Sequence, residues 1–144
     1  MNNLDKLAAI FNVRWSDFKP EEVLSPDGLK LVHNQGVFPL QYSALDKLQA
    51  FREHLGKPFK INDSVNKRRG WRSVKENYDL NRYQFSFHLA GCAFDVSVDG
   101  LTPEEVKEAA LDFGYTGVGV YKTFTHLDTR ALIGAPIQWE RGQA

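Results

Sequence analysis

Apolar residues recur every three or four positions in three segments of the chain, which is the period of an amphipathic helix. These segments are residues 4–10, 43–56 and 102–114. In the second, Ser43 can cap the first turn and Gly56 can end the last one. In the third, Thr102, Pro103 and Glu105 form the capping-box pattern that begins a helix. The chain is therefore predicted to form three helices.

Four further segments read as short strands, and they are residues 59–61, 93–98, 117–121 and 124–129. Side chains alternate between the two faces of a strand. In the segment 93–98 the large apolar side chains therefore share one face, and Asp95 lies on the other. By the same rule, His126 and Asp128 point into the same space. These elements predict an α+β fold, with a small antiparallel sheet and helices packed around it.

The segments between these elements show no sustained period. Residues 16–25 are predicted to form a loop, and residues 62–84 a long polar loop. Loops of the second length are uncommon in compact domains unless they have a function or are disordered. A chain of 144 residues has the size of one domain. We therefore predict a single domain, 1–144, in which residues 1–42 pack on the rest as a helix and loops.

Charge and cysteine content exclude several classes of protein. Lys and Arg number 18 and balance 18 Asp and Glu, so no net charge draws the protein to nucleic acid or to anionic membranes. We also expect a monomer. Cys92 is the single cysteine, which excludes a disulfide framework and a structural zinc site built on cysteines. No apolar stretch approaches the roughly 20 residues of a membrane span. The N-terminus lacks the pattern of a signal peptide, so we expect a protein made in the cytoplasm.

Two histidines and one aspartate, His88, His126 and Asp95, are candidate metal ligands. Two imidazoles and one carboxylate fill three corners of a tetrahedron and leave the fourth for water. A Zn²⁺ ion bound there lowers the pKa of that water to roughly 7 and polarises a carbonyl under attack. The residue types therefore predict a catalytic zinc site on the open face of the sheet.

Residues 86–95 read Ser-x-His-x-x-Gly-x-Ala-x-Asp. This pattern resembles the signature of the zinc D-alanyl-D-alanine carboxypeptidases, within the lysostaphin, carboxypeptidase and hedgehog metallopeptidase superfamily. Upstream, residues 71–73 resemble the aromatic-Arg-Ser segment that precedes the first histidine in those proteins. Downstream, residues 117–128 resemble the last ligand strand of the small phage and bacterial members. The resemblance covers roughly residues 45–139 and rests on three motifs in the same order.

The resemblance implies a role for each motif residue. The ligands of Zn²⁺ would be His88, Asp95 and His126. Arg72 would pair with a substrate carboxylate or hold the scissile carbonyl, for which a planar guanidinium is well suited. Ser86 and Tyr121 would line the substrate site.

The chain departs from the resembled family at the general base. Well-known members place a glutamate or histidine three residues before the last ligand histidine. Here that residue is Thr123, which cannot accept the proton. Asp128 lies on the same predicted strand face as His126, and we infer that Asp128 is the base.

Two other function classes stay open at this point. His126 and Asp128 also match the His-x-Asp part of the ligand set of non-haem iron oxygenases, but no histidine follows Asp128 to complete that set. The missing glutamate leaves open a zinc-bearing binding module or virion component without turnover.

The sequence thus predicts a zinc peptidase that hydrolyses an amide bond in the peptide stem of bacterial peptidoglycan. It would be an endopeptidase of the endolysin type or a D,D-carboxypeptidase. Zinc-bound water would attack the carbonyl, Asp128 would take its proton, and Arg72 would stabilise the oxyanion or anchor the substrate. Small size and no recognised export signal suit a phage lysis enzyme that a separate holin releases to the cell wall.

Overall fold

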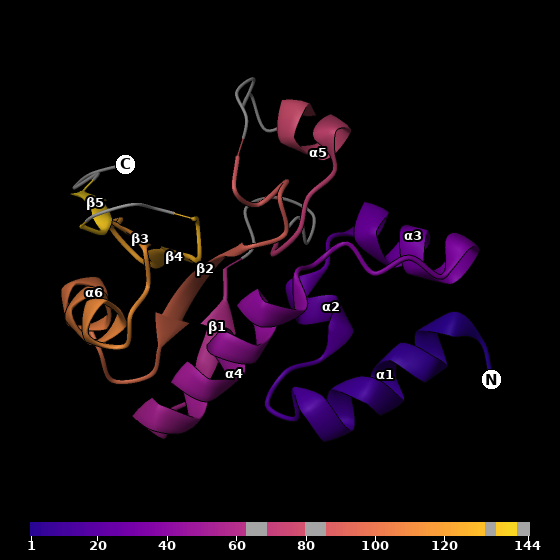
Figure 1. Ribbon diagram of the computed structural model, residues 1–144, viewed down its shortest axis with the longest axis horizontal. Coiled ribbons are helices and arrows are strands. Elements are labelled where there is room, and N and C mark those ends of the chain that lie inside the picture. The colour runs from indigo at the N-terminus through magenta and orange to yellow at the C-terminus, as the bar shows by residue number, and fades with distance from the viewer. Residues whose placement is uncertain (63–68, 80–85, 132–134, 141–144) are drawn as a thin grey trace.

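A small sheet and a set of short helices make up the fold (Figure 1). The structure is a computed structural model, and it describes residues 1–62, 69–79, 86–131 and 135–140. Its helices are α1 (Asn3–Arg14), α2 (Pro20–Val23), α3 (Pro26–Gln35), α4 (Tyr42–Leu55), α5 (Val74–Asp79) and α6 (Pro103–Asp112). Its strands are β1 (Phe59–Ile61), β2 (Ala93–Val98), β3 (Gly117–Val120), β4 (Thr125–Asp128) and β5 (Ile137–Glu140).

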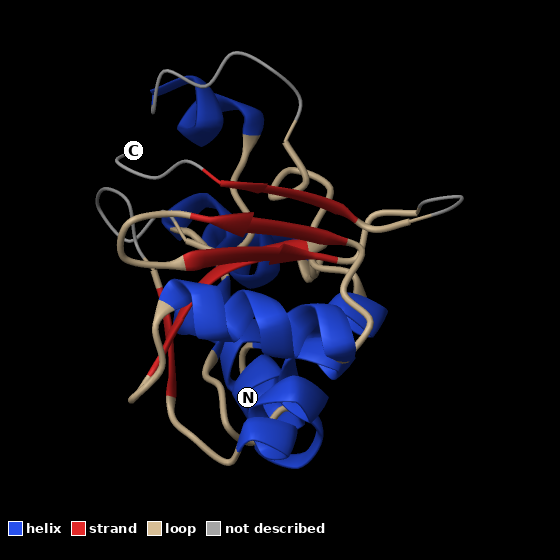
Figure 2. Cartoon of the chain, turned by 90° about the vertical axis from the view of Figure 1, so that its left-hand side faces the viewer, coloured by secondary structure: helices blue, strands red, loops and turns tan. Residues whose placement is uncertain are grey.

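The strands lie side by side in one sheet (Figure 2). Their order across the sheet is β1-β2-β4-β3-β5. The pairs β1 with β2, β2 with β4, and β4 with β3 are antiparallel. The predicted α+β fold with a small antiparallel sheet is confirmed. The sequence did not predict β5, which pairs in parallel with β3 and forms one edge of the sheet.

One face of the sheet packs on helices and forms the core. Phe94 of β2 is buried in the same apolar cluster as Leu48 and Phe51 of α4 and Ala110 of α6. The apolar positions of β2 are buried as predicted, whereas Asp95 is partly exposed on the other face. The helices therefore leave the face that carries Asp95 available for a site.

The start of α4 differs from the prediction. The helix begins at Tyr42, so Ser43 is not its N-cap, and Gln41 takes that position. The backbone N–H of Gln41 donates to the carbonyl of Gly91, and its side-chain amide donates to the carbonyl of Ala90. A contact with a distant segment therefore sets the first turn, and a local sequence pattern cannot show such a contact.

Three helices were not predicted. The interpretation of residues 16–25 as a loop is wrong in part, because α2 lies within that segment and α3 follows it directly. Ser25 caps α3 by accepting a hydrogen bond from the N–H of Gly28, and Pro26 occupies the first turn. The third helix, α5, lies inside the predicted loop 62–84, of which residues 63–68 and 80–84 fall outside the described residues.

Candidate metal centre

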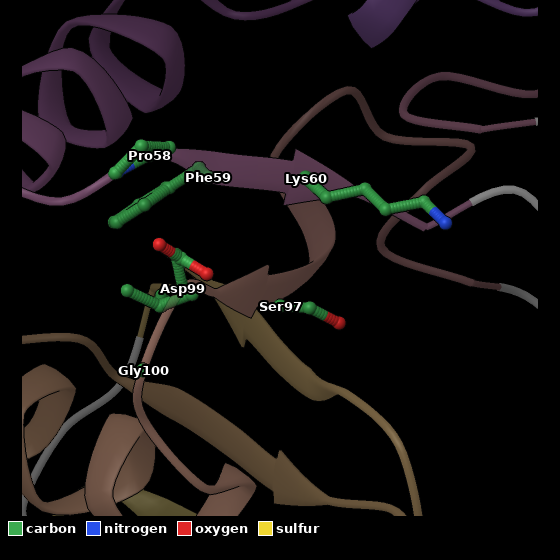
Figure 3. Close-up of a pocket in the computed structure, with 7 residues that line it drawn as sticks. Pro58, Phe59, Lys60, Ser97, Asp99 and Gly100 are labelled. Carbon is green, nitrogen blue, oxygen red and sulfur yellow. The ribbon is translucent and has the colours of Figure 1, made fainter.

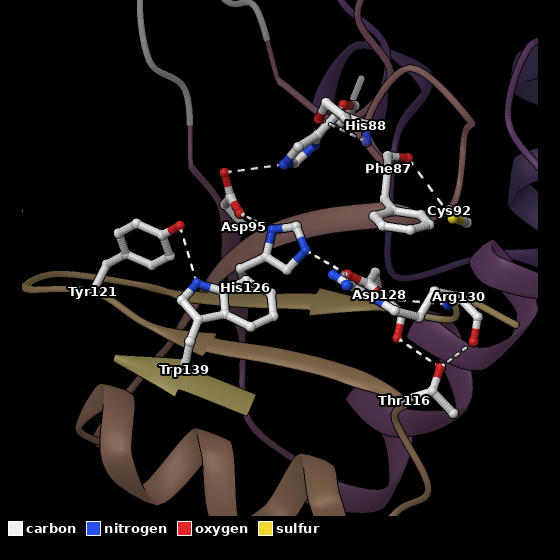
Figure 4. A network of polar contacts seen from close by, with 12 residues as sticks. Phe87, His88, Cys92, Asp95, Thr116, Tyr121, His126, Asp128, Arg130 and Trp139 are labelled. Atoms are coloured by element: carbon white, nitrogen blue, oxygen red, sulfur yellow. Dashed lines mark hydrogen bonds and ion pairs between the residues drawn. The ribbon is translucent and has the colours of Figure 1, made fainter. Parts of the chain in front are cut away.

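Asp95 and His126 face each other across neighbouring strands. They are direct partners in the register of β2 and β4, and both side chains emerge opposite the core. Nδ1 of His126 lies 3.1 Å from Oδ1 of Asp95 (Figure 4). The alternation predicted for both strands therefore brings a carboxylate and an imidazole together.

His88 reaches the same place from the turn that precedes β2. Oγ of Ser86 accepts a hydrogen bond of 3.2 Å from the N–H of His88, which holds the turn together. Nδ1 of His88 donates to the carbonyl oxygen of Gly70 at 3.0 Å. The other ring nitrogen, Nε2, is thereby left as an acceptor, and it lies 3.4 Å from Oδ2 of Asp95.

These three side chains could hold a metal ion. One nitrogen from each histidine and one oxygen of Asp95 all lie within 4.8 Å of one another. The second nitrogen of each imidazole is hydrogen-bonded to an acceptor, which is the carbonyl of Gly70 for His88 and the carboxylate of Asp128 for His126. Histidines that bind metals usually have such a partner. Two imidazoles and one carboxylate suit Zn²⁺ with one position left open.

Asp128 lies on the far side of the His126 ring. Its Oδ2 is 2.7 Å from Nε2 of His126, and its side chain is fully buried. Arg130 donates to both oxygens of the same carboxylate, with Nε 2.7 Å from Oδ1. The sequence predicted that His126 and Asp128 share one face of their strand, and in the structure the two side chains are in contact. The role of Asp128 as general base stays a prediction.

An aromatic wall, formed by Trp139 and Tyr121, borders the metal centre (Figure 4). The ring of Phe124 stacks on that of Tyr121. Gly119 pairs with His126 on one side and with Trp139 on the other. A Cβ at Gly119 would overlap the indole, so the glycine lets Trp139 lie over the sheet with its ring 5.1 Å from that of His126. Nε1 of Trp139 lies 3.3 Å from the Tyr121 hydroxyl. The sequence predicted a substrate role for Tyr121, and the structure brings Trp139 beside it.

The segment that carries Arg72 packs beside the turn of His88. The N–H of Trp71 donates to the carbonyl of Val23, and its indole N–H donates to the carbonyl of Leu89, each at 3.0 Å. Arg72 follows directly and is buried. The substrate roles of Arg72, Ser86 and Tyr121 stay predictions.

The charged groups around His126 shift one another's pKa values. Burial would raise the pKa of Asp95, but the imidazoles of His88 and His126 outweigh it and hold this pKa below its ordinary value. Burial would also raise the pKa of Asp128, but hydrogen bonds from Arg130 and His126 outweigh it and hold this pKa below its ordinary value. Burial would lower the pKa of His126, but its hydrogen bonds to Asp128 and Asp95 raise this pKa to about 9.

The raised pKa of His126 predicts how the stability of the metal-free protein depends on pH. A histidine with a pKa of 6.5 when unfolded and about 9 when folded binds its proton more tightly in the folded state. Its contribution is therefore complete below pH 6.5 and is lost as the pH rises through 9. We expect urea unfolding of chelator-treated protein to give a lower free energy of unfolding at pH 9 than at pH 6.5. The His126→Gln variant should lose most of this difference, and an equal difference in both proteins would contradict the prediction.

A separate hollow lies where the start of β1 pairs with the end of β2 (Figure 3). Residues 58–60 and 97–100 line it. None of the three candidate metal ligands lines this hollow, so it is a site distinct from the metal centre.

Comparisons with known proteins place the chain in a family. Among the residues that the structure describes, no helix has the length and apolar character of a membrane span. A search of curated proteins found no match. The sequence does match the Peptidase M15 family over residues 18–128, a stretch that contains all three candidate ligands. Because this match covers more than half of the sequence, the chain belongs to the Peptidase M15 family.

Proposed function

We propose that this protein is a zinc-dependent peptidase that hydrolyses an amide bond in the peptide stem of bacterial peptidoglycan. The observation that carries the proposal is the convergence of His88, Asp95 and His126 on one face of the sheet, in a chain of the Peptidase M15 family. The motif that resembles the D-alanyl-D-alanine carboxypeptidases supports peptidoglycan as the substrate.

Each residue of the proposed site would have a defined task. Zn²⁺ held by the three ligands supplies a Lewis acid that polarises a carbonyl and acidifies a water molecule. Arg72 would grip a carboxylate or the carbonyl oxygen through its planar guanidinium. Ser86 would line the site beside His88, and Tyr121 with Trp139 would position the peptide from the aromatic wall.

The general base is the least supported of these assignments. Asp128 contacts Nε2 of His126, whereas Nδ1 is the nitrogen that faces Asp95. Both oxygens of Asp128 also accept hydrogen bonds from Arg130. These contacts favour a role for Asp128 in holding His126 over a role in taking a proton from water.

The proposal is tested by incubating the purified protein with peptidoglycan and identifying the released fragments by mass spectrometry. We expect zinc-dependent release that stops after chelation and returns when zinc is added. Free D-alanine would indicate a carboxypeptidase, whereas shortened or separated peptide stems would indicate an endopeptidase. Peptidoglycan that stays intact in the presence of zinc-loaded protein would contradict the proposal.

A zinc-bearing binding module is the second candidate function. The observation that favours it is the absence of a free carboxylate at the two expected base positions: Thr123 is a threonine, and Asp128 is held by Arg130. In this case zinc-loaded protein should sediment with insoluble peptidoglycan and release no fragments from it.

A further inference from the structure

We propose that Arg130 acts through Asp128 as a positioning residue that fixes the ring and the tautomer of His126, and thereby strengthens metal binding. This inference rests on the proposed function, because it requires that His126 bind the metal through Nδ1. Arg130 lies outside the stretch that matches the Peptidase M15 family, and its position gives residues 126–130 the pattern His-x-Asp-x-Arg.

The hydrogen bonds of Asp128 form a chain from Arg130 to the imidazole. The guanidinium binds the carboxylate as a fork, with Nε on Oδ1 and Nη2 on Oδ2. The backbone N–H of Arg130 adds a third hydrogen bond, 3.1 Å to Oδ1. The carboxylate in turn accepts from Nε2 of His126 at 2.7 Å. A proton kept on Nε2 leaves Nδ1 with the lone pair that a metal ion needs.

The sheet provides the space for this pair. Asp128 of β4 lies between Ala93 of β2 and Gly117 of β3 in the register of the three strands. A Cβ at Gly117 would overlap both the Asp128 carboxylate and Nε of Arg130. The small residues on both sides of Asp128 therefore leave space on the sheet for the ion pair of Asp128 and Arg130, next to His126.

Arg130 is itself held in place by groups from three segments. Its guanidinium carbon lies 4.1 Å from the centre of the Phe87 ring and 5.3 Å from the ring of Trp139. Its carbonyl accepts a hydrogen bond of 2.7 Å from Oγ1 of Thr116. Phe87 is the residue before His88, so Arg130 contacts the turn that carries one ligand while it holds the strand that carries another.

The test measures zinc affinity directly, by competition with a chromophoric chelator. Loss of a group that supports a metal ligand typically weakens metal binding by about 10- to 100-fold. We expect a loss of this size for Arg130→Gln and for Asp128→Asn. Arg130→Lys keeps the charge but lacks the fork, so its affinity should lie between that of the parent and that of Arg130→Gln.

Arg14 offers a matched control. It forms the same forked pair with Asp46 on an exposed surface, at 2.9 and 2.8 Å. Arg14→Gln should leave zinc affinity unchanged. A second measurement follows the imidazole of His126 by ¹⁵N NMR in metal-free protein, at a pH above its pKa of about 9, where the ring carries a single proton. The parent should carry that proton on Nε2, and Arg130→Gln should show a mixture of tautomers. Should Arg130→Gln fail to fold, Arg130→Lys carries both measurements.

The outcomes separate this inference from the proposed function. A parent protein that binds no zinc would contradict the proposed function itself. A parent that binds zinc, with Arg130→Gln equal to Arg14→Gln in affinity and His126 still protonated on Nε2, would overturn only the role of Arg130. Asp128→Asn with full zinc affinity and lost peptidase activity would overturn it as well, and would assign Asp128 as the general base.

Discussion

Replacing His126 with alanine is expected to remove the bound zinc and to lower peptidase activity by about 10³-fold or more. A metal ion supplies several kcal/mol of transition-state stabilisation, and each 1.36 kcal/mol corresponds to a factor of about ten in rate. The variant would keep only His88 and Asp95 as ligands. It would also leave the carboxylates of Asp95 and Asp128 without the imidazole that lies between them. His88→Ala and Asp95→Ala should give the same result.

Elemental analysis of protein purified without added metal checks this prediction, together with the rate of fragment release. The parent should contain about one equivalent of zinc per chain, and each ligand variant should contain only background levels. His33→Ala is the matched control, because His33 is an exposed histidine on α3 outside the cluster. Full zinc content in any ligand variant would remove that residue from the ligand set. Iron in place of zinc, with turnover of an oxo-acid cosubstrate, would favour an oxygenase.

The second large effect is expected at Arg72, where lysine should impair turnover almost as much as alanine. A lysine keeps the positive charge but cannot form two parallel hydrogen bonds to a carboxylate or a carbonyl oxygen. Loss of one such group from a catalytic site typically costs about 10²- to 10³-fold in rate. Zinc content should stay at the parent level in both variants, which separates the handling of substrate from the assembly of the metal centre.

Kinetic constants then identify what Arg72 does. A rise in KM alone would mean that Arg72 binds the ground state and the transition state equally, as an anchor for a terminal carboxylate does. An equal fall in kcat and kcat/KM would mean that it acts on the oxyanion.

Arg69→Lys is the control from the same segment, since Arg69 donates to the carbonyl of Glu21. Arg72 is buried, so urea unfolding should accompany the rates. Full activity in a folded Arg72→Ala variant would contradict the prediction.

The candidate ligands were predicted from their residue types and from the resemblance to the carboxypeptidases, and the period of two in strands predicted how two of them are oriented. That rule placed Asp95 opposite the apolar residues of β2, and it placed His126 and Asp128 on one face. The rule cannot say which nitrogen of His126 is free for a metal ion. That choice depends on the register between β2 and β4 and on Arg130, whose contacts exist only once β3 leaves room for them.

The parts of the fold that were missed depend on contacts between distant residues. β5 is a short and largely exposed strand that pairs with β3, so Trp139 enters the site through a pairing that no local pattern marks. α3 has a readable start at Ser25 and Pro26, but only Gly28 and Val32 are buried along it. Such a narrow buried stripe is weak evidence for a helix in a single sequence.

The position of Gly70 ties the metal centre to the N-terminal helices. Its carbonyl fixes the orientation of His88, while its own placement depends on Val23 at the end of α2, whose backbone occupies the space where a Cβ would lie. The next residue, Trp71, pairs with Val23 and with Ser25 at the start of α3. Capture of a metal ion and docking of these helices onto the sheet are therefore thermodynamically linked, since each favours the same position of one carbonyl group. A substitution that displaces the backbone of Val23 would therefore weaken metal binding from outside the ligand set.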